Sequence, residues 1–332
     1  MKVDYHLHLE EGPYSFRWLD RTNLALDHFH PIKEKPHTME WLKKAEARIN
    51  NRLNKGCYSA EWLDLYLEEA LNKGIKEVGI VDHLYRFHET RSYYEKYMDV
   101  TSPEIGPLQQ KWLNQVMTES IYEFVTAINQ AKKRWEEKGV ILRLGIESDY
   151  FPGCEEELGE LLSLVEWDYV IGSVHFLNGW GFDNPETQDR FKSLDLLKTY
   201  EEFFGVVEMA IKSNLFDFVA HLDNLKVFNH RPDEEKLVPF YHQIADALVE
   251  TVTATEINAG LFYRYPVKEM CPSPSFLSVL VNKGVLFTLS SDAHFPDDLG
   301  KHVSDNVNTL KKLGCKELVT FDKRRRIMKP IQ

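Results

Sequence analysis

The chain contains 13 histidines, and several of them stand at or directly after the end of a short apolar run. Imidazole and carboxylate side chains together suit zinc, iron or manganese, and such a site needs no thiolate. At the bending end of a strand, both rings of a His-x-His pair can reach one ion, and His6 and His8 form such a pair. The other candidate ligands are His83, Glu147, His175, His221, Asp292 and His294. Their types and spacing predict a metal centre in which a glutamate, Glu147, bridges two ions.

A lone histidine at a strand end is more often a hydrogen-bonded structural residue than a ligand. Six histidines and two carboxylates at corresponding positions reverse that expectation. Six further histidines lie in predicted loops or helices and are interpreted as surface residues, namely His28, His30, His37, His88, His230 and His242. The role of His302 stays open, because it lies near the loop after the last predicted strand.

The elements that would position these residues alternate regularly along the chain. Strands are predicted at residues 2–6, 77–83, 140–147, 168–175, 216–221, 253–258 and 285–292. Helices are predicted at residues 61–72, 115–138, 155–165, 194–214, 237–250, 275–283 and 303–313, and Gly74 and Gly139 end the first two. The strands are short, apolar and β-branched, which is typical of parallel sheets buried on both faces.

About seven such βα units predict an α/β fold closed into a barrel, with the active site at the C-terminal ends of the strands. The polar residues named above would then converge on one face. An open, doubly wound sheet is the alternative. No glycine-rich phosphate loop follows any predicted strand, which weighs against that alternative.

Two stretches interrupt the alternation within what we interpret as a single domain spanning residues 1–332. Residues 12–57, with a predicted helix at 38–54, follow the first strand, and residues 88–107 follow the second. Both insertions come after strand ends, so they could form a lid or substrate wall. Plain surface elaboration is an equally good interpretation. The basic run at residues 323–326 is predicted to be a solvated helix end.

Composition and charge limit the partners. The chain has 52 acidic and 40 basic residues, hence a net charge of −12, which disfavours nucleic-acid binding. Metal ions or a few arginines would have to hold any phosphate-bearing substrate. No run of apolar residues is long enough to span a membrane, and no signal peptide is evident, so a cytoplasmic protein is expected. The four cysteines are far apart and are expected to be reduced thiols: Cys57, Cys154, Cys271 and Cys315.

The ordered set of strand-end motifs resembles the polymerase and histidinol phosphatase (PHP) superfamily. Residues 173–183 (SVHFLNGWGFD), 256–264 (EINAGLFYR), 272–275 (PSPS) and 291–300 (SDAHFPDDLG) are most similar to its histidinol-phosphatase branch. The resemblance extends from Asp4 to about Gly314. It implies a distorted (β/α)7 barrel with a trinuclear metal site, holding two or three divalent ions of zinc, iron or manganese.

The resemblance also implies a ligand set. The first ion would take His6, His8, Glu147 and Asp292, and the second would share Glu147 and take His175 and His221. The third would take His83, His294 and one residue from the loop after the first strand. The family commonly has a histidine or Asp-Gly there, five or six positions past the second histidine, where this chain has Pro13 and Tyr14. Glu11, directly before Gly12, is the predicted substitute.

The implied activity is metal-assisted hydrolysis of a phosphomonoester, L-histidinol phosphate, to L-histidinol and phosphate in histidine biosynthesis. Arg264 is the candidate phosphate ligand beside the catalytic pair Asp292 and His294, and a surface ion pair is its alternative role. His302 and Asp223 are candidate proton donors, and Asp223 could instead support a histidine ligand. No oligomeric state is predicted.

Three other functions stay open on the sequence alone. The same site could act on another small phosphomonoester, a nucleotide or a phosphodiester. A metal-dependent amidohydrolase also begins with His-x-His on a barrel, but it usually bridges its metals with a lysine, and here Glu147 holds that place. A metal-stabilised scaffold without turnover is the third, and the nearly complete ligand set argues against it.

Overall fold

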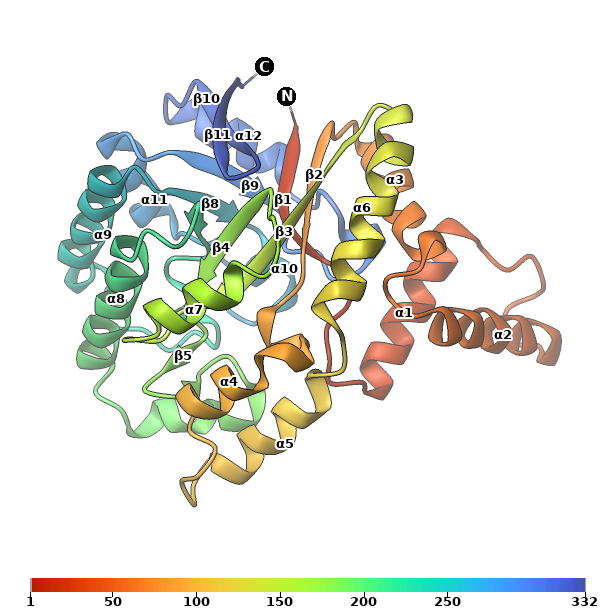
Figure 1. Ribbon diagram of the computed structural model, residues 1–332, viewed down its shortest axis with the longest axis horizontal. Coiled ribbons are helices and arrows are strands. Elements are labelled where there is room, and N and C mark those ends of the chain that lie inside the picture. Colours follow the sequence, from red (N-terminus) through yellow and green to blue (C-terminus); the bar gives the residue numbers. More distant parts are fainter. Residues whose placement is uncertain (1, 332) are drawn as a thin grey trace.

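The computed structural model describes residues 2–331, and its centre is a sheet of seven parallel strands. They follow one another in the order β1 (Val3–His8), β2 (Glu77–Val81), β3 (Ile141–Asp149), β4 (Tyr169–Ser173), β7 (Phe218–Val219), β8 (Ala254–Asn258) and β9 (Phe287–Ser290). The last strand returns to the first: the amide of Asp292 donates to the carbonyl of His6 (2.9 Å), and that of His8 to Ala293 (2.7 Å). The sheet therefore closes into the predicted seven-stranded barrel (Figure 1).

Side chains fill the barrel interior, as the apolar character of the strands predicts. The ring of Tyr169 lies against Gly79 and Gly145, where a Cβ atom would come within 2.2 Å and 2.3 Å of it. Glycine is required at both positions because the neighbouring strands leave this space to the tyrosine. In β1 the register shifts between Asp4 and Leu7, so that strand has one residue more than β2 over the same length.

A short antiparallel hairpin covers the N-terminal end of the barrel (Figure 1). It consists of β10 (Glu317–Asp322) and β11 (Arg325–Pro330), and its Phe321 packs on the rings of Tyr5 and Phe218, both at 5.7 Å between centroids. The predicted helix end at residues 323–326 is therefore wrong. Lys323 and Arg324 form a two-residue turn with left-handed φ angles of 50° and 63°. An ion pair from Arg324 to Asp217 holds this turn, which lacks the usual Asn-Gly signature.

Helices surround the barrel: α3 (Ala60–Lys73), α6 (Ile121–Glu137), α7 (Glu155–Leu162), α8 (Leu196–Lys212), α9 (Val238–Thr251), α11 (Pro274–Lys283) and α12 (Val303–Lys312). The predicted helix at residues 115–138 begins too early: its first two residues belong to the end of α5 (Gly106–Val116), and α6 starts only at Ile121. The break forms because Glu89 accepts hydrogen bonds from Ser120 Oγ (2.8 Å) and the Ile121 amide (3.3 Å). No described helix is both long and apolar enough to cross a membrane.

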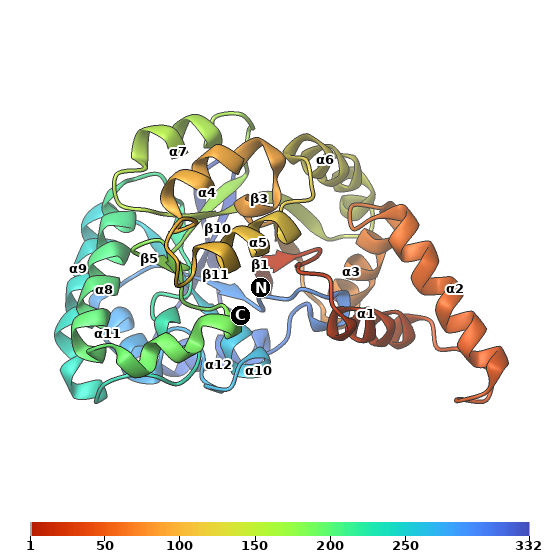
Figure 2. The same cartoon turned by 90° about the horizontal axis from the view of Figure 1, so that it is seen from below.

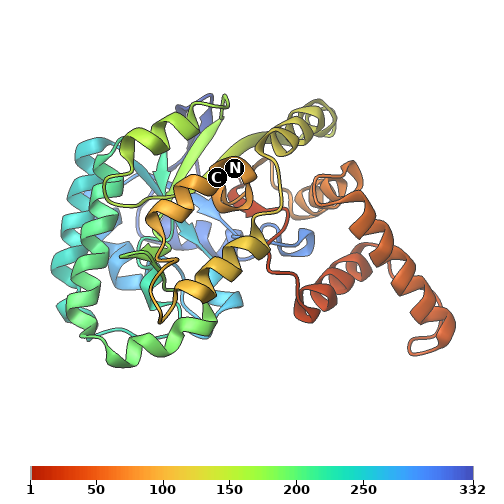
Figure 3. The ribbon, with the colours of Figure 1, turned by 60° about the horizontal axis from the view of Figure 1, so that its bottom comes forward.

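The two insertions lie in different places. Residues 12–57 contain α1 (Phe16–Phe29), which the sequence did not predict, and α2 (Met39–Lys55), which projects away from the barrel (Figures 2 and 3). The second insertion contains α4 (Arg91–Tyr97) and leads into α5. In the view from below, α4 and α5 cross in front of the C-terminal ends of β1 and β3 (Figure 2). The first insertion also borders this face, because Arg21 of α1 forms ion pairs with Asp297 (2.8 Å) and Asp298 (2.9 Å) in the loop that follows His294.

Candidate metal centre

The C-terminal ends of the strands bring five histidine rings around one carboxylate, that of Glu147. Its Oε2 lies 3.2 Å from His6 Nε2, 3.3 Å from His8 Nε2 and 2.8 Å from His83 Nδ1. Its Oε1 lies 3.1 Å from His221 Nε2 and 3.6 Å from His175 Nε2. Each oxygen thus faces its own set of ring nitrogens, which is the arrangement expected of a carboxylate shared between cations.

Two further predicted ligands, Asp292 and His294, follow β9 and join the cluster. Asp292 Oδ1 lies 3.8 Å from His8 Nε2 and 3.7 Å from His294 Nδ1. Asp292 and His221 both adopt left-handed backbone angles, with φ values of 52° and 27°. Non-glycine residues in this region carry strain that typically persists at functional sites.

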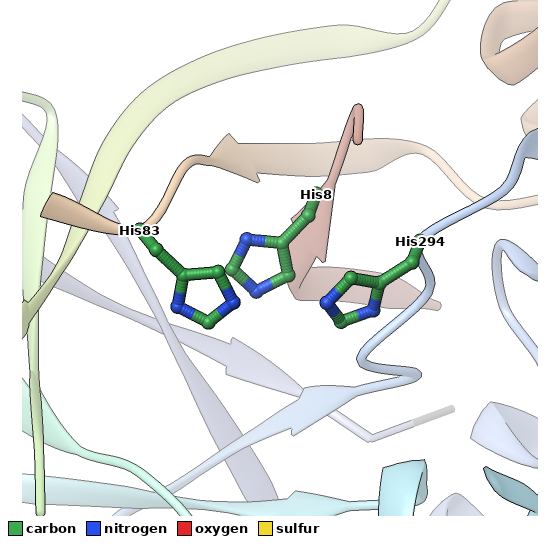
Figure 4. A group of neighbouring side chains, drawn as sticks. All are labelled: His8, His83 and His294. Carbon is green, nitrogen blue, oxygen red and sulfur yellow. The ribbon is translucent and has the colours of Figure 1, made fainter. Parts of the chain in front are cut away.

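The donor atoms of the cluster are arranged as ligands of metal ions and do not form a complete set of hydrogen bonds with one another. The Nε2 atoms of His6 and His8 are 3.1 Å apart, and those of His175 and His221 are 3.2 Å apart. The ring of His8 stacks between His83 and His294 at 4.0 Å and 4.4 Å (Figure 4). Among the described residues, four buried atoms of the cluster find no hydrogen-bond partner: His8 Nδ1, His83 Nε2, Glu147 Oε2 and His294 Nε2.

The cluster contains three groups of side chains that could each hold an ion, because the donor atoms within each group lie within 4.8 Å of one another. These groups are His6, His8 and Asp292; His8, His83 and His294; and His83, Glu147 and His175. Because neutral imidazole and carboxylate are the ligand forms that zinc, iron and manganese bind, the residues fit divalent transition metals.

Two members of the cluster, Glu147 and His8, are held in the protonation states that a metal ligand needs. Burial opposes ionisation of Glu147, but the adjacent His6 and His83 rings outweigh it and hold its pKa well below the usual value. Burial, reinforced by His83 and His294, lowers the pKa of His8 far below that of free histidine. His8 therefore stays neutral at neutral pH, with a lone pair available to a cation.

Two carboxylates that the sequence analysis did not select hold the histidines in place. Both oxygens of Glu256 lie 3.1 Å from His6 Nδ1, and Oε1 also accepts the amide of His221 (3.2 Å). Asp149 Oδ1 lies 2.7 Å from His175 Nδ1 and raises the pKa of that ring to about 10 against the opposing effect of burial. Carboxylate partners of this kind fix the orientation and tautomer of a ligating ring. Alternation along β3 could have revealed Asp149, which is two residues beyond Glu147 on the same face.

Glu11 and Arg264, the predicted third-site ligand and phosphate ligand, contact each other at the edge of the cluster. Arg264, the last residue of α10 (Gly260–Arg264), contacts Glu11 Oε2 (2.6 Å) and Asp292 Oδ1 (3.4 Å). The same Glu11 oxygen lies 3.4 Å from His294 Nε2. Arg264 is therefore no isolated surface ion pair, because both of its partners belong to the cluster.

Two residues proposed as proton donors lie outside the cluster. His302 Nδ1 is 3.2 Å from Asp305, and its ring packs on Phe262. Asp223 accepts hydrogen bonds from Lys226 Nζ and the Ser273 amide, both at 2.8 Å, so its contacts secure the loop before α11. The other six histidines also lie apart: His28, His30, His37, His88 and His242 are exposed, and His230 stacks on Phe191.

Gly260 offers a test of this geometry, because a Cβ atom there would lie 2.2 Å from Asp292 Oδ2. We expect Gly260→Ala to displace that carboxylate and lower kcat/KM about 10- to 100-fold while the protein stays folded. Steady-state kinetics with circular dichroism would check this. Gly205→Ala in α8 is the matched control, since a Cβ atom there meets nothing within 4 Å. Equal activity of the two variants would contradict the position given to Asp292.

Comparison with known proteins identifies relatives of this chain. A family model described as the PHP domain matches residues 57–260. A curated protein from Deinococcus radiodurans, named probable histidinol-phosphatase, is 36% identical over 214 residues, which cover 64% of this chain and 78% of that protein.

Two solved structures share the fold. The histidinol phosphate phosphatase of Lactococcus lactis subsp. lactis, solved with zinc, L-histidinol and phosphate, superimposes with a TM-score of 0.66 at 18% identity, covering 98% of both chains. The putative histidinol phosphatase of Listeria monocytogenes gives a TM-score of 0.63 at 16% identity, covering 92% of this chain and 99% of that one.

Proposed function

Because this chain belongs to the PHP domain family, we propose that it is a metal-dependent phosphomonoesterase that hydrolyses L-histidinol phosphate to L-histidinol and phosphate. One observation carries the proposal most directly: five histidine rings from four strand ends surround the buried carboxylate of Glu147. The name of the Deinococcus radiodurans relative supports the choice of substrate.

The metal complement we propose is two or three divalent transition-metal ions. His6, His8 and Asp292 would hold one ion, and His175 with His221 a second, both sharing Glu147. His83 and His294, with Glu11 as the third ligand, would hold the remaining ion. When bound, such ions activate water and neutralise charge on phosphoryl oxygens. The solved structure from Lactococcus lactis contains zinc, which supports zinc as one occupant.

The protein's own residues would bind and orient the substrate. Arg264 holds two carboxylates at the edge of the cluster, and its planar guanidinium can exchange one of them for a phosphate with the same two-pronged geometry. The net charge of −12 suits a substrate that carries a cationic amine.

Exclusion of water strengthens these interactions. The histidines and carboxylates around Glu147 are buried, so charge developing on the phosphate would be stabilised in a low dielectric.

All four cysteines are free, and three of them are buried, as expected of reduced thiols. Together with the biosynthetic reaction, this favours the cytoplasm as the place of action.

Arg264→Lys is expected to weaken kcat/KM for the phosphomonoester by roughly 1–3 kcal/mol, because lysine cannot form the two-pronged contact. Phosphate release under steady-state conditions would measure it. Arg231→Lys is a matched control, since Arg231 also pairs two-pronged with a glutamate, Glu269, but away from the cluster. If both substitutions lower kcat/KM by the same factor, Arg264 does not bind the phosphate of the substrate.

A growth test addresses the proposed function in cells. A bacterial strain that lacks its own histidinol phosphatase cannot grow without histidine. Expression of the wild-type chain is expected to restore that growth, and the Glu147→Gln variant at equal abundance is expected to fail. Lack of growth with abundant, folded wild-type protein would argue against this substrate and leave another small phosphomonoester as the candidate.

A further inference from the structure

We propose that α4, which lies in the second insertion, and α5, which directly follows it, act as a support for one side of the metal centre. Two separate chains of contacts lead from these helices to His175 and His83. The inference rests on the proposed metal-binding function. It adds to that function two positioning residues, Tyr94 and Tyr85, that no ligand pattern in the sequence indicates.

The first chain of contacts is a hydrogen-bond relay. The hydroxyl of Tyr94 in α4 donates to Asp149 Oδ2 (2.8 Å), and the other oxygen of the same carboxylate lies 2.7 Å from His175 Nδ1. Tyr94 has no exposed surface, and Asp149 is 2% exposed. A buried carboxylate with both oxygens engaged has a fixed orientation, so Tyr94 sets the plane in which His175 presents its Nε2 to the centre.

The second chain of contacts is a column of rings. Trp112 in α5 packs edge-on against Tyr85 at 4.9 Å between centroids, and Tyr85 stacks on His83 at 4.5 Å with 13° between the planes. His83 in turn stacks on His8 at 4.0 Å, again with 13° between the planes. His83 is therefore held between Tyr85 and a second candidate ligand. Packing of this kind restricts the tilt of the imidazole without using either of its nitrogens.

Both chains end on the same group of donor atoms, that of His83, Glu147 and His175. The opposite side of the centre is held from within the barrel, where Glu256 of β8 contacts His6 and His221. Disturbing α4 or α5 should therefore loosen the ions that depend on His83 and His175 and leave the ion held by His6, His8 and Asp292 in place. The structure thus assigns to this insertion a role in metal retention besides that of a wall.

The test measures zinc retained by the full-length protein. Zinc-loaded wild type, Tyr94→Phe and Tyr85→Leu are equilibrated with increasing concentrations of a chelator, and bound zinc per chain is measured by elemental analysis. Each variant is expected to lose part of its zinc at a roughly 10-fold or more lower chelator concentration than wild type, the usual effect of removing a partner of a ligand. The last ion should leave at the wild-type concentration.

Two conservative variants serve as controls. Tyr97→Phe removes another α4 hydroxyl, which donates to the carbonyl of Gly153 (3.2 Å), and Tyr85→Phe keeps the stacked ring. Both should retain zinc like wild type. Wild-type retention in Tyr94→Phe and Tyr85→Leu would overturn the inference, as would uniform loss of all zinc with a lowered melting temperature. A wild-type protein that binds neither zinc nor manganese nor iron(II) would instead refute the proposed metal-dependent function.

Discussion

Replacing Glu147 by glutamine is expected to lower kcat/KM for a phosphomonoester by roughly 10³-fold or more, which corresponds to about 4 kcal/mol of lost transition-state stabilisation. Both carboxylate oxygens face histidine nitrogens, at 2.8–3.6 Å, and the side chain is 1% exposed. Glutamine keeps the shape but removes the negative charge that allows cations to lie close together. Steady-state kinetics on protein of known metal content would measure the effect.

The matched control is Glu77→Gln. Glu77 is equally buried on the neighbouring strand, but it lies towards the other end of the barrel, where it accepts a hydrogen bond from Tyr5 (2.6 Å) and contacts Arg143 (2.9 Å). We expect that substitution to lower the melting temperature and to leave kcat/KM nearly unchanged. Near wild-type turnover of Glu147→Gln with its metal retained would show that the bridge between ions lies elsewhere.

Removal of the metal ions is the second change with a large expected effect. Dialysis against a chelator should reduce phosphate release at least about 10³-fold, and zinc, manganese or iron(II) should restore it. The ions should also stabilise the fold, by about 4 kcal/mol when free metal exceeds its dissociation constant 1,000-fold. Without them, the closely spaced nitrogens of His6 and His8 and of His175 and His221 have no cation between them.

Activity and melting temperature should therefore fall and recover together as metal is removed and returned. Protein purified without chelator is expected to contain two or three ions per chain, because the candidate ligands exceed what one ion can use. Full activity with one ion or none would contradict the multinuclear centre.

The strands and the candidate ligands were predictable from the sequence because two local patterns occur together, an apolar strand and a polar residue at its end. Each buried strand is a short β-branched run, and a polar residue follows it where the chain leaves the barrel. Glu147, His175 and His221 are of this kind, and the parallel sheet brings them together. A closed barrel leaves little freedom in where these strand ends point.

Other features depend on contacts that no local pattern encodes. The turn at Lys323 and Arg324 uses left-handed residues without glycine or asparagine and is held by a distant partner, Asp217. The break between α5 and α6 depends on Glu89, some 30 residues earlier. The roles of Glu256 and Asp149 became visible only when the barrel placed each of them behind a histidine ring.

The positions of the two insertions also could not be predicted from local sequence patterns. The sequence gives the same expectation for residues 12–57 and 88–107, namely that each could cover the site, since both follow strand ends. The structure separates them: α2 projects away from the barrel, whereas Tyr94 of α4 reaches Asp149 beside His175 (Figure 2). The difference lies in tertiary packing, because both segments are helical and rich in aromatic residues.

The central claim, that this centre hydrolyses L-histidinol phosphate, is tested most directly by one comparison of kcat/KM on zinc-loaded protein. Phosphate release from L-histidinol phosphate is compared with hydrolysis of bis(p-nitrophenyl) phosphate under identical conditions. The account predicts a clear preference for L-histidinol phosphate, because Arg264 and the metal centre suit a terminal phosphate and the acidic protein suits a cationic amine. A preference for the diester would contradict the assignment as a phosphomonoesterase.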